Sequence, residues 1–398
     1  MRIWRLFTPI ISIFSLFAYG QVEAKNVNWT GYLQLDENVA LPFNFLLEQT
    51  QIVILNGSEK ITLTRQSNTP DSVDYVFPNF DSFLRIVASK TNEMKGYWYN
   101  KQRGEHYKIP FYAIPSLTLD DPDIHQIAGK WETTFGIETN KPYKSLGVFE
   151  QTGTKLTGTF LTETGDYRYL TGYTERDKVV LSTFDGAFAF LFTAIYDGTQ
   201  LKGKFYSGNH WKTEWIAERN DAFELKDAAS ITYVNSDTIP IHFALPDLNG
   251  DTLTFPNSLF DNKVVIIQLM GSWCPNCLDE AVFFEELLGS YKKRGLEVIT
   301  ICYELPKTLE QKIAAVNRMI NRNGFSFHFL IGGDAKKAVA SSHFPMLNEI
   351  VSFPTSLFLD KRGKIVHIHT GFSGPGTGIY YEQLRKNTVE LIERLLQQ

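Results

Sequence analysis

The sequence has only three cysteines in 398 residues, and it has no cluster of lysine or arginine residues. So few cysteines exclude a scaffold built on several disulfides, but they leave room for one redox-active pair. The net charge of −5 and the lack of a basic cluster argue against a nucleic-acid partner. Beyond the N-terminus, the sequence also lacks an apolar run long enough to span a membrane. The length itself favours two or three globular domains.

The N-terminus has the pattern of a secretory signal peptide. A short positive segment, "MRIWR", precedes the apolar run "LFTPIISIFSLFAYG", and small residues follow at "VEA". We therefore expect residues 1–24 to direct export, with a periplasmic location that is either free or membrane-associated. The alternative is an uncleaved anchor, which would be the chain's only contact with the membrane. Pro9 interrupts this run, whereas a spanning helix needs about 20 apolar residues. No cysteine follows the run, which excludes a lipid-modified lipoprotein.

Residues 28–220 have the pattern of an all-β region. Runs such as "QIVILN", "KVVLSTF" and "AFLFTAIY" are rich in β-branched and aromatic residues, and Gly, Asn and Asp interrupt them at short intervals. No amphipathic helix of three turns is expected here. The aromatic residues of this region, including Trp98, Tyr99, Trp211 and Trp215, are more typical of a core or its rim than of a ligand cage.

An internal repeat divides this region in two. "FDSFLRIVASKTNEMKGYWYN" begins at Phe80, and "FDGAFAFLFTAIYDGTQLKGKFYS" begins at Phe184. The repeat predicts two tandem β-modules, 28–118 and 128–220, each long enough for a small barrel or sandwich. Two unrelated meanders that share hairpin chemistry are the alternative. The modules have no catalytic triad, metal cluster or phosphate loop in their sequence, so we expect them to add no chemistry of their own.

A polar linker, residues 221–239, leads to a region in which strands and helices alternate. Continuous apolar runs at 263–270 and 296–304 predict strands that are covered on both faces. Helices are expected directly after the first run, at 308–324 with a capping box, and at 380–396 near the C-terminus. This order predicts an α/β domain over 240–398 with a mixed central sheet and helices on both of its faces.

Cys274 and Cys277 stand between the first of these strands and its helix, in "LMGSWCPNC". This spacing places Cys274 at the helix N-terminus, where free N–H groups and the helix dipole stabilise a thiolate. Cys277, one turn later, can close a ring with it, so a redox couple is favoured. A metal site would need more ligands, but Cys302 lies in an apolar strand, and we expect His367 and His369 to be solvated. A structural staple is disfavoured because so short a loop removes little chain entropy.

Residues 240–398 resemble the TlpA/ResA-like branch of the thioredoxin superfamily, which consists of exported thiol–disulfide oxidoreductases. The segments that carry the resemblance are "HFALPDLNGDTLTF", "LMGSWCPNC", "YKKRGLEVITICYE" and "VSFPTSLFLDKRGKIV". The resemblance implies a thioredoxin-like fold in which Cys274 attacks a substrate disulfide and Cys277 resolves the mixed disulfide. It also implies a cis peptide bond before Pro354, facing the cysteines, and a substrate-binding role for Trp273, Phe353 and Pro354.

The family pattern also assigns a role to an acidic residue. Thioredoxin itself has a buried Asp six residues before its first cysteine, and that position is Gln268 here. The TlpA/ResA-like branch often has a Glu three residues after the second cysteine, which is Glu280 here, although the proline that commonly follows is Val282. The resemblance therefore implies that Glu280 transfers protons for the two cysteines. The alternative is that Glu280 only stabilises the first turn of the helix.

These observations predict an enzyme that reduces, or exchanges, disulfides of envelope proteins, with electrons from a membrane donor. No cofactor, metal or nucleic acid is expected to take part. A peroxidase of the peroxiredoxin type is one alternative, but the Thr usual three residues before the reactive cysteine is Gly271 here. A binding or scaffold protein that works through its β-modules is another, and the intact cysteine pair argues against it.

Overall fold

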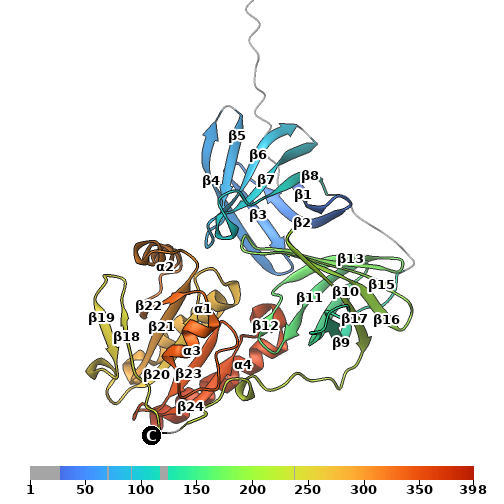
Figure 1. The fold of residues 1–398 in the computed structure, drawn as a ribbon. Coiled ribbons are helices and arrows are strands. Elements are labelled where there is room, and N and C mark those ends of the chain that lie inside the picture. The colour runs from blue at the N-terminus through green and yellow to red at the C-terminus, as the bar shows by residue number, and fades with distance from the viewer. Residues whose placement is uncertain (1–26, 70, 91, 117–123, 237) are drawn as a thin grey trace, which may run out of the picture.

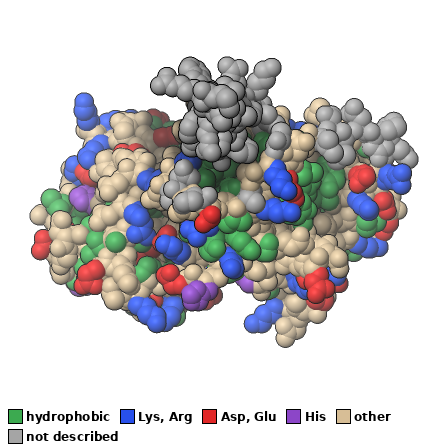
Figure 2. All heavy atoms as spheres, turned by 90° about the horizontal axis from the view of Figure 1, so that it is seen from above, with side chains coloured by type: hydrophobic (Ala, Val, Ile, Leu, Met, Phe, Trp, Pro, Cys, Tyr) green, Lys and Arg blue, Asp and Glu red, His purple; other side chains and the backbone are tan. Residues whose placement is uncertain are grey.

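The computed structural model describes residues 27–398 except 70, 91, 117–123 and 237, so the predicted signal peptide lies outside the described residues. Figure 1 shows two β-rich modules, drawn from blue to green, followed by an α/β domain drawn from yellow to red. Both modules contact the α/β domain: Asn79 of the first accepts a hydrogen bond from Asn323, and Asp166 of the second accepts one from Asn276. On the face seen in Figure 2, acidic and basic side chains are interspersed.

The first module is a closed antiparallel barrel. Each strand pairs with the next along the chain, and β1 also pairs with β8, which closes the barrel. Because side chains alternate between the two faces of a strand, Phe45, Trp98 and Phe111 fill the interior. Among the described residues, its strands are β1 (Val27–Asp36), β2 (Val39–Leu47), β3 (Gln51–Asn56), β4 (Glu59–Thr69), β5 (Ser72–Val76), β6 (Ser82–Lys90), β7 (Glu93–Asn100) and β8 (Lys108–Pro115).

The second module is also barrel-like. Its strands form a sheet in the order β10-β9-β17-β16-β15-β14-β13-β11-β12, and the extra pairing of β10 with β11 closes all of them except β12 into a ring. Trp131, Phe160 and Trp215 are buried inside it. Among the described residues, its strands are β9 (Gly129–Phe135), β10 (Tyr143–Thr152), β11 (Lys155–Thr162), β12 (Gly165–Asp166), β13 (Leu170–Glu175), β14 (Lys178–Phe184), β15 (Ala189–Tyr196), β16 (Gln200–Ser207) and β17 (Trp211–Arg219).

The two copies of the sequence repeat occupy corresponding strands of the two barrels, β6 and β7 in the first and β15 and β16 in the second. The repeated glycine has the same physical role in each copy. A Cβ atom on Gly96 would lie 1.8 Å from the carbonyl oxygen of Arg85, and a Cβ atom on Gly203 would lie 1.8 Å from that of Thr193. Only glycine allows this close approach of neighbouring strands. The expected all-β modules are therefore confirmed as barrels.

The α/β domain has a mixed sheet in the order β22-β21-β20-β23-β24, as predicted. β20, β21 and β22 run parallel, whereas β23 is antiparallel to both β20 and β24. Helices α1, α2 and α4 pack on one face, and α3 packs on the other together with the hairpin β18–β19. The strands are β18 (Phe243–Pro246), β19 (Thr252–Phe255), β20 (Val264–Met270), β21 (Leu296–Glu304), β22 (His328–Asp334), β23 (Thr355–Leu359) and β24 (Ile365–Thr370).

The helices of the described residues are α1 (Pro275–Tyr291), α2 (Leu309–Asn323), α3 (Lys337–His343) and α4 (Ile379–Gln397). Both hydrogen bonds of the predicted capping box are present in α2, between Thr308 and Gln311. Among the helices that the structure describes, none is both long and apolar enough to cross a membrane. Pro354 directly precedes β23.

Candidate active site

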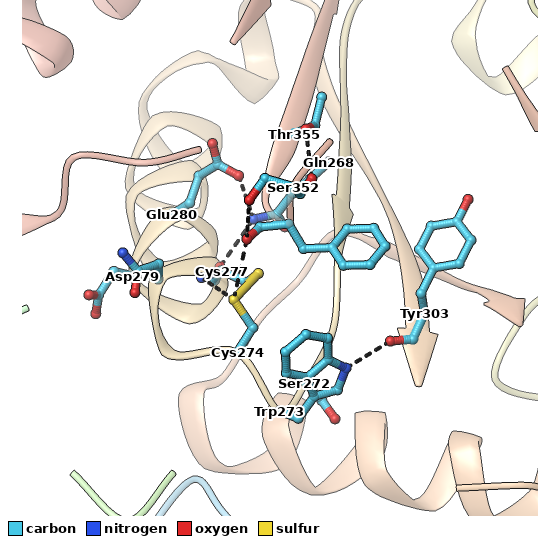
Figure 3. Close-up of a disulfide and its surroundings, with 12 residues drawn as sticks. Gln268, Ser272, Trp273, Cys274, Cys277, Asp279, Glu280, Tyr303, Ser352 and Thr355 are labelled. Atoms are coloured by element: carbon cyan, nitrogen blue, oxygen red, sulfur yellow. Dashed lines mark hydrogen bonds between the residues drawn. A yellow bond between two sulfur atoms is a disulfide. The ribbon is translucent and has the colours of Figure 1, made fainter. Parts of the chain in front are cut away.

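Cys274 and Cys277 lie where β20 ends and α1 begins (Figure 3). Cys274 is the N-cap residue of α1, and its Sγ accepts a hydrogen bond from the backbone N–H of Cys277 at 3.3 Å. The two cysteines form a disulfide with a Cα–Cα distance of 5.3 Å. Cys274 is 7% exposed and Cys277 is fully buried. A sulfur at this position receives a backbone N–H donor and the positive end of the helix dipole.

The loop before β23 faces this disulfide. The peptide bond between Phe353 and Pro354 is cis, as the resemblance implied. The carbonyl oxygen of Phe353 lies 3.7 Å from Cys274 Sγ. The Phe353 ring stacks on Tyr303, with 5.2 Å between ring centroids, and meets the edge of Trp273 at 6.3 Å. The structure thus brings Trp273, Phe353 and Pro354 together around Cys274.

Glu280 is buried in the first turns of α1 and belongs to a hydrogen-bond network (Figure 3). Its Oε2 accepts hydrogen bonds from Gln268 Nε2 and from Ser356 Oγ, both at 2.9 Å. Gln268 Nε2 also donates to the carbonyl oxygen of Cys277 at 3.1 Å, and Gln268 Oε1 accepts from Thr300 Oγ1. Gln268 therefore connects Glu280 to the turn that contains Cys277.

Burial raises the pKa of Glu280 to about 8, although the hydrogen bonds from Gln268 and Ser356 act in the opposite direction. A buried carboxyl is costly to ionise because the protein interior solvates the charge poorly. The carboxyl therefore mostly holds its proton near neutral pH and exchanges it in the range where thiols titrate. Proton transfer between a carboxyl and a thiol is efficient when the pKa values of the two groups are close.

A second buried carboxyl, Glu304, was not identified from the sequence. It is the last residue of β21, and its two oxygens accept hydrogen bonds from the N–H and the Oγ of Ser272, each at 2.7 Å. Burial raises the pKa of Glu304 to about 7. The neighbouring Trp273 donates its indole N–H to the carbonyl oxygen of Tyr303 at 3.0 Å. These contacts fix the loop before Cys274. The sequence feature that could have identified Glu304 is its place as the one charged residue at the end of the apolar strand "VITICYE".

The second barrel also reaches the site, which sequence analysis did not predict. We call residues 162–168 the docking segment; it contains β12 and connects β11 to β13. Asn276, between the two cysteines, donates its Nδ2 hydrogen bond to the carbonyl oxygen of Asp166 at 3.1 Å. Ser352, in the loop of Pro354, donates to the carbonyl oxygen of Thr164 at 3.2 Å. Backbone carbonyl groups make both contacts, so the docking segment carries little signature of them in its sequence.

Cys274 opens into a pocket of about 790 Å³ between the second barrel and the α/β domain. The docking segment and the start of β10 form one side of this pocket. The other side is formed by the cysteine loop and Phe353. The residues that line it are Pro142, Tyr143, Lys144, Thr162, Glu163, Thr164, Gly165, Asp166, Tyr167, Phe188, Lys226, Trp273, Cys274, Asn276 and Phe353.

The remaining thiol and the two histidines lie apart from this pocket. Cys302 is free and fully buried in β21, and burial raises its pKa well above the usual value. The expectation that His367 and His369 are solvated was wrong: both are half-buried on β24, and burial lowers both pKa values, that of His369 to about 4. Within the described part of the chain, no group of three or more His, Cys, Asp or Glu residues is arranged to hold a metal ion.

Comparisons with known proteins cover the C-terminal part of the chain. Residues 234–384 match the Redoxin family. The thiol-disulfide oxidoreductase ResA of Halalkalibacterium halodurans is 29% identical over 131 residues, which are 33% of this chain and 66% of that protein. ResA of Geobacillus kaustophilus is also 29% identical, over 129 residues that are 32% of this chain and 66% of that protein. The chain therefore spans just under two thirds of the length of these relatives.

Among solved structures, StoA from Bacillus subtilis is 23% identical to this chain. The alignment covers 38% of this chain and 98% of the StoA chain, with a TM-score of 0.27. The Redoxin match begins after the last strand of the second barrel, so both barrels precede it. The match includes both cysteines, Glu280 and the loop of Pro354. Residues 234–384 thus match the Redoxin family and are similar to ResA proteins, and they follow an N-terminal β-rich region.

Proposed function

We propose that this chain is an exported thiol–disulfide oxidoreductase that reduces, or exchanges, disulfides of envelope proteins. The observation that carries the proposal is the position of Cys274: it caps α1, its Sγ accepts the Cys277 N–H at 3.3 Å, and the cis-Pro354 loop lies beside it. The similarity to ResA proteins supports the same chemistry. The leader pattern of residues 1–24 supports export.

In the first step, the thiolate of reduced Cys274 attacks one sulfur of a substrate disulfide. A new S–S bond joins Cys274 to the substrate, the substrate S–S bond breaks, and the second substrate sulfur leaves as a thiolate that takes up a proton. The helix N-terminus stabilises the attacking thiolate. Phe353 and Pro354 hold the substrate beside Cys274, because the Phe353 carbonyl lies 3.7 Å from its Sγ.

In the second step, Cys277 attacks Cys274 Sγ and releases the reduced substrate. Two electrons have then passed to the substrate, and Cys274 and Cys277 form the disulfide. Cys277 must lose its proton to attack, and in this proposal the proton passes to the fraction of Glu280 that is ionised. Two features support this role: Gln268 holds the Glu280 carboxyl next to the turn of Cys277 by bonding the Cys277 backbone carbonyl, and the pKa of about 8 places the carboxyl in the titration range of thiols.

Each turnover leaves the enzyme oxidised, so a reductant must restore the thiols. For an exported enzyme, we propose a membrane electron donor, and we propose envelope proteins as the substrates. The domain limits of this proposal are the signal peptide at 1–24, β-modules at 28–118 and 128–220, a linker at 221–239 and the thioredoxin-like domain at 240–398.

The test compares two activities of the purified chain without its leader. Insulin reduction should occur in the wild type and be lost in Cys274→Ser, whereas Cys302→Ser should retain it because Cys302 is buried in β21. Cys277→Ser should accumulate a mixed disulfide, and mass spectrometry of that adduct from cells would identify the partner. Absence of insulin reduction by the wild type would overturn the proposal.

Peroxide consumption is the second measurement, because it separates the reductase from a peroxidase. A Cβ atom on Gly271 would lie 2.1 Å from the indole nitrogen of Trp273, so the hydroxyl residue typical of peroxiredoxins has no room at this position. We expect peroxide consumption to stay near background. Rapid peroxide turnover with little insulin reduction would favour the peroxidase instead.

A further inference from the structure

The second barrel is packed too closely on the Redoxin domain to be a loosely tethered neighbour. A Cβ atom on Gly371 would lie 2.4 Å from the backbone carbon of Thr164, and one on Gly376 would lie 2.9 Å from that of Arg168. Glycine at these two positions allows the backbone of the docking segment to lie directly on the Redoxin domain. The Asp166 carboxylate adds a hydrogen bond from the N–H of Gly374 at 2.6 Å.

The pocket that leads to Cys274 has aromatic side chains from both domains. Trp273 and Phe353 stand on the Redoxin side, and Tyr143, Tyr167 and Phe188 stand on the side of the second barrel. The two tyrosines are joined by a hydrogen bond of 2.8 Å between their hydroxyl groups. All five residues are half-buried. The barrel thus contributes aromatic surface opposite the residues expected to bind substrate.

The charged side chains that line the pocket are already engaged. Lys144 pairs with Glu132 at 2.5 Å, and Lys226 pairs with Glu163 at 3.5 Å. The Asp166 carboxylate accepts the N–H groups of Gly374 and of Arg168. The lining thus has two cations, Lys144 and Lys226, and two carboxylates, Glu163 and Asp166, so no sign of charge dominates and the aromatic groups give the pocket its selectivity.

We propose that the second barrel forms half of the substrate site, and that this site selects a polypeptide segment whose disulfide is flanked by aromatic or large aliphatic side chains. The inference rests on the proposed function and adds its specificity-determining residues, Tyr143, Tyr167 and Phe188. A pocket of about 790 Å³ lies within the range of about 300–1,000 Å³ typical of specific binding sites. It accepts a few side chains rather than a flat protein face, so only a narrow segment reaches Cys274.

The test uses the full chain without its leader, reduced and freed of reductant, in single-turnover reactions. Three synthetic peptides contain the same internal disulfide and differ only in the flanking residues, which are Phe, Asp or Lys. We expect the Phe peptide to react about tenfold faster than both others, the size of effect that one apolar group gives in a hydrophobic pocket. The Lys peptide is the control for the net charge of −5, which by itself would repel only the Asp peptide.

The contribution of the barrel is tested with Phe188→Ala. Its matched control is Phe83→Ala, because Phe83 is likewise a half-buried aromatic but lies on the first barrel, stacked on Tyr99. We expect Phe188→Ala to lose most of the preference for the Phe peptide and Phe83→Ala to keep it. Alkylation of Cys274 by iodoacetamide in Phe83→Ala should keep the wild-type rate, because Phe83 lies on the first barrel and does not line the pocket. Tyr143→Leu is the second variant should Phe188→Ala not fold, and we expect it to lose the preference as well.

Each outcome has a distinct meaning. Equal rates for the three peptides, or equal rates for the Phe and Lys peptides, would overturn the inference while leaving the oxidoreductase intact. A preference that survives Phe188→Ala and Tyr143→Leu would assign the selectivity to Trp273 and Phe353 alone, which also overturns it. A wild type that reduces neither the peptides nor a small aromatic disulfide would instead contradict the proposed function. Rapid reduction of the small disulfide together with slow reduction of every peptide would show that the site takes small molecules, and the inference would fall.

Discussion

The guanidinium group of Arg168, in the docking segment, forms a buried ion pair with the carboxylate of Asp279 on α1 of the Redoxin domain. Arg168 also pairs with Glu59 of the first barrel and with Asp185 of the second, the latter at 3.3 Å from Nε. Burial alone would lower the pKa of Arg168, but the carboxylates around it raise that pKa, so the cation is retained. One side chain therefore joins all three domains, and its partner Asp279 lies two residues after Cys277.

We expect Arg168→Gln to destabilise the chain by about 3–5 kcal/mol, because it leaves buried carboxyl groups without their cation. Urea denaturation followed by tryptophan fluorescence measures this change. Arg85→Gln is the matched control: Arg85 pairs with Asp74 at 2.7 Å, but its side chain is 37% exposed. An exposed pair contributes less than about 1 kcal/mol. Equal shifts of the two midpoints would contradict a central role for Arg168.

Gly376→Ala should loosen the second barrel from the Redoxin domain. The new Cβ atom would lie 3.0 Å from the carbonyl oxygen of Arg168, and a backbone atom cannot move aside as a flexible side chain can. We expect faster hydrogen exchange in residues 162–168 and faster alkylation of Cys274, which is 7% exposed in the intact structure. Gly289→Ala is the control, because a Cβ atom on this α1 residue would have no neighbour within 4 Å. Identical hydrogen exchange in both variants would mean that the contact at Gly376 does not hold residues 162–168 on the Redoxin domain.

In the reduced protein, Cys274 should react with iodoacetamide first. Cys274 is 7% exposed and lines the pocket, whereas Cys277 and Cys302 are fully buried. Its thiolate is also the form that the helix N-terminus stabilises. Mass spectrometry after brief alkylation near neutral pH identifies the modified residue. Earlier labelling of Cys277 or Cys302 would refute the assignment of Cys274 as the nucleophile.

Glu280→Gln should slow the resolution of the mixed disulfide. Glutamine keeps the shape and the hydrogen bonds but cannot take a proton, and a well-placed general base contributes about 10²–10⁴-fold to a rate. The rate of disulfide exchange between pH 6 and about 9 should lose an inflection near the Glu280 pKa of about 8. Glu286→Gln, on the exposed side of the same helix, is the control. Superimposable pH profiles would mean that Glu280 is only a structural acid of the first turns.

The buried carboxyls also predict an unusual dependence of stability on pH. The folded-state pKa is about 8 for Glu280 and about 7 for Glu304, both raised by burial from 4.5. Folded protein therefore holds protons that the unfolded chain has already released. Unfolding then releases protons, so the contribution of these two groups to the free energy of unfolding is fully present below pH 4.5 and is lost as pH rises to about 8.

The slope should reach about 1.4 kcal/mol per pH unit for each group within its window. Urea midpoints measured at several pH values test this slope. Glu280→Gln and Glu304→Gln should each flatten it, and Glu286→Gln should not. A slope that neither Glu280→Gln nor Glu304→Gln changes would mean that these two carboxyls are ionised in the folded protein.

Local patterns in the sequence determined the redox centre. An apolar strand, a Cys-x-x-Cys pair and an amphipathic helix follow one another along the chain, so the position of Cys274 as the N-cap depends only on residues within a few positions of it. The same holds for the barrels, whose alternating runs and turn residues predict antiparallel strands. The cis bond before Pro354 came from the family resemblance, and the structure confirms it.

Only the tertiary structure decided how the centre is enclosed. The contacts of Thr164 with Ser352 and of Arg168 with Asp279 join residues that are 188 and 111 positions apart, and a backbone carbonyl makes the first of them. No local pattern specifies which surface a barrel will bury against another domain. The pKa values of Glu280 and Glu304 have the same origin, because they depend on the exclusion of water by segments remote in the sequence. The cysteine chemistry follows from neighbours along the chain, whereas access to it follows from neighbours in space.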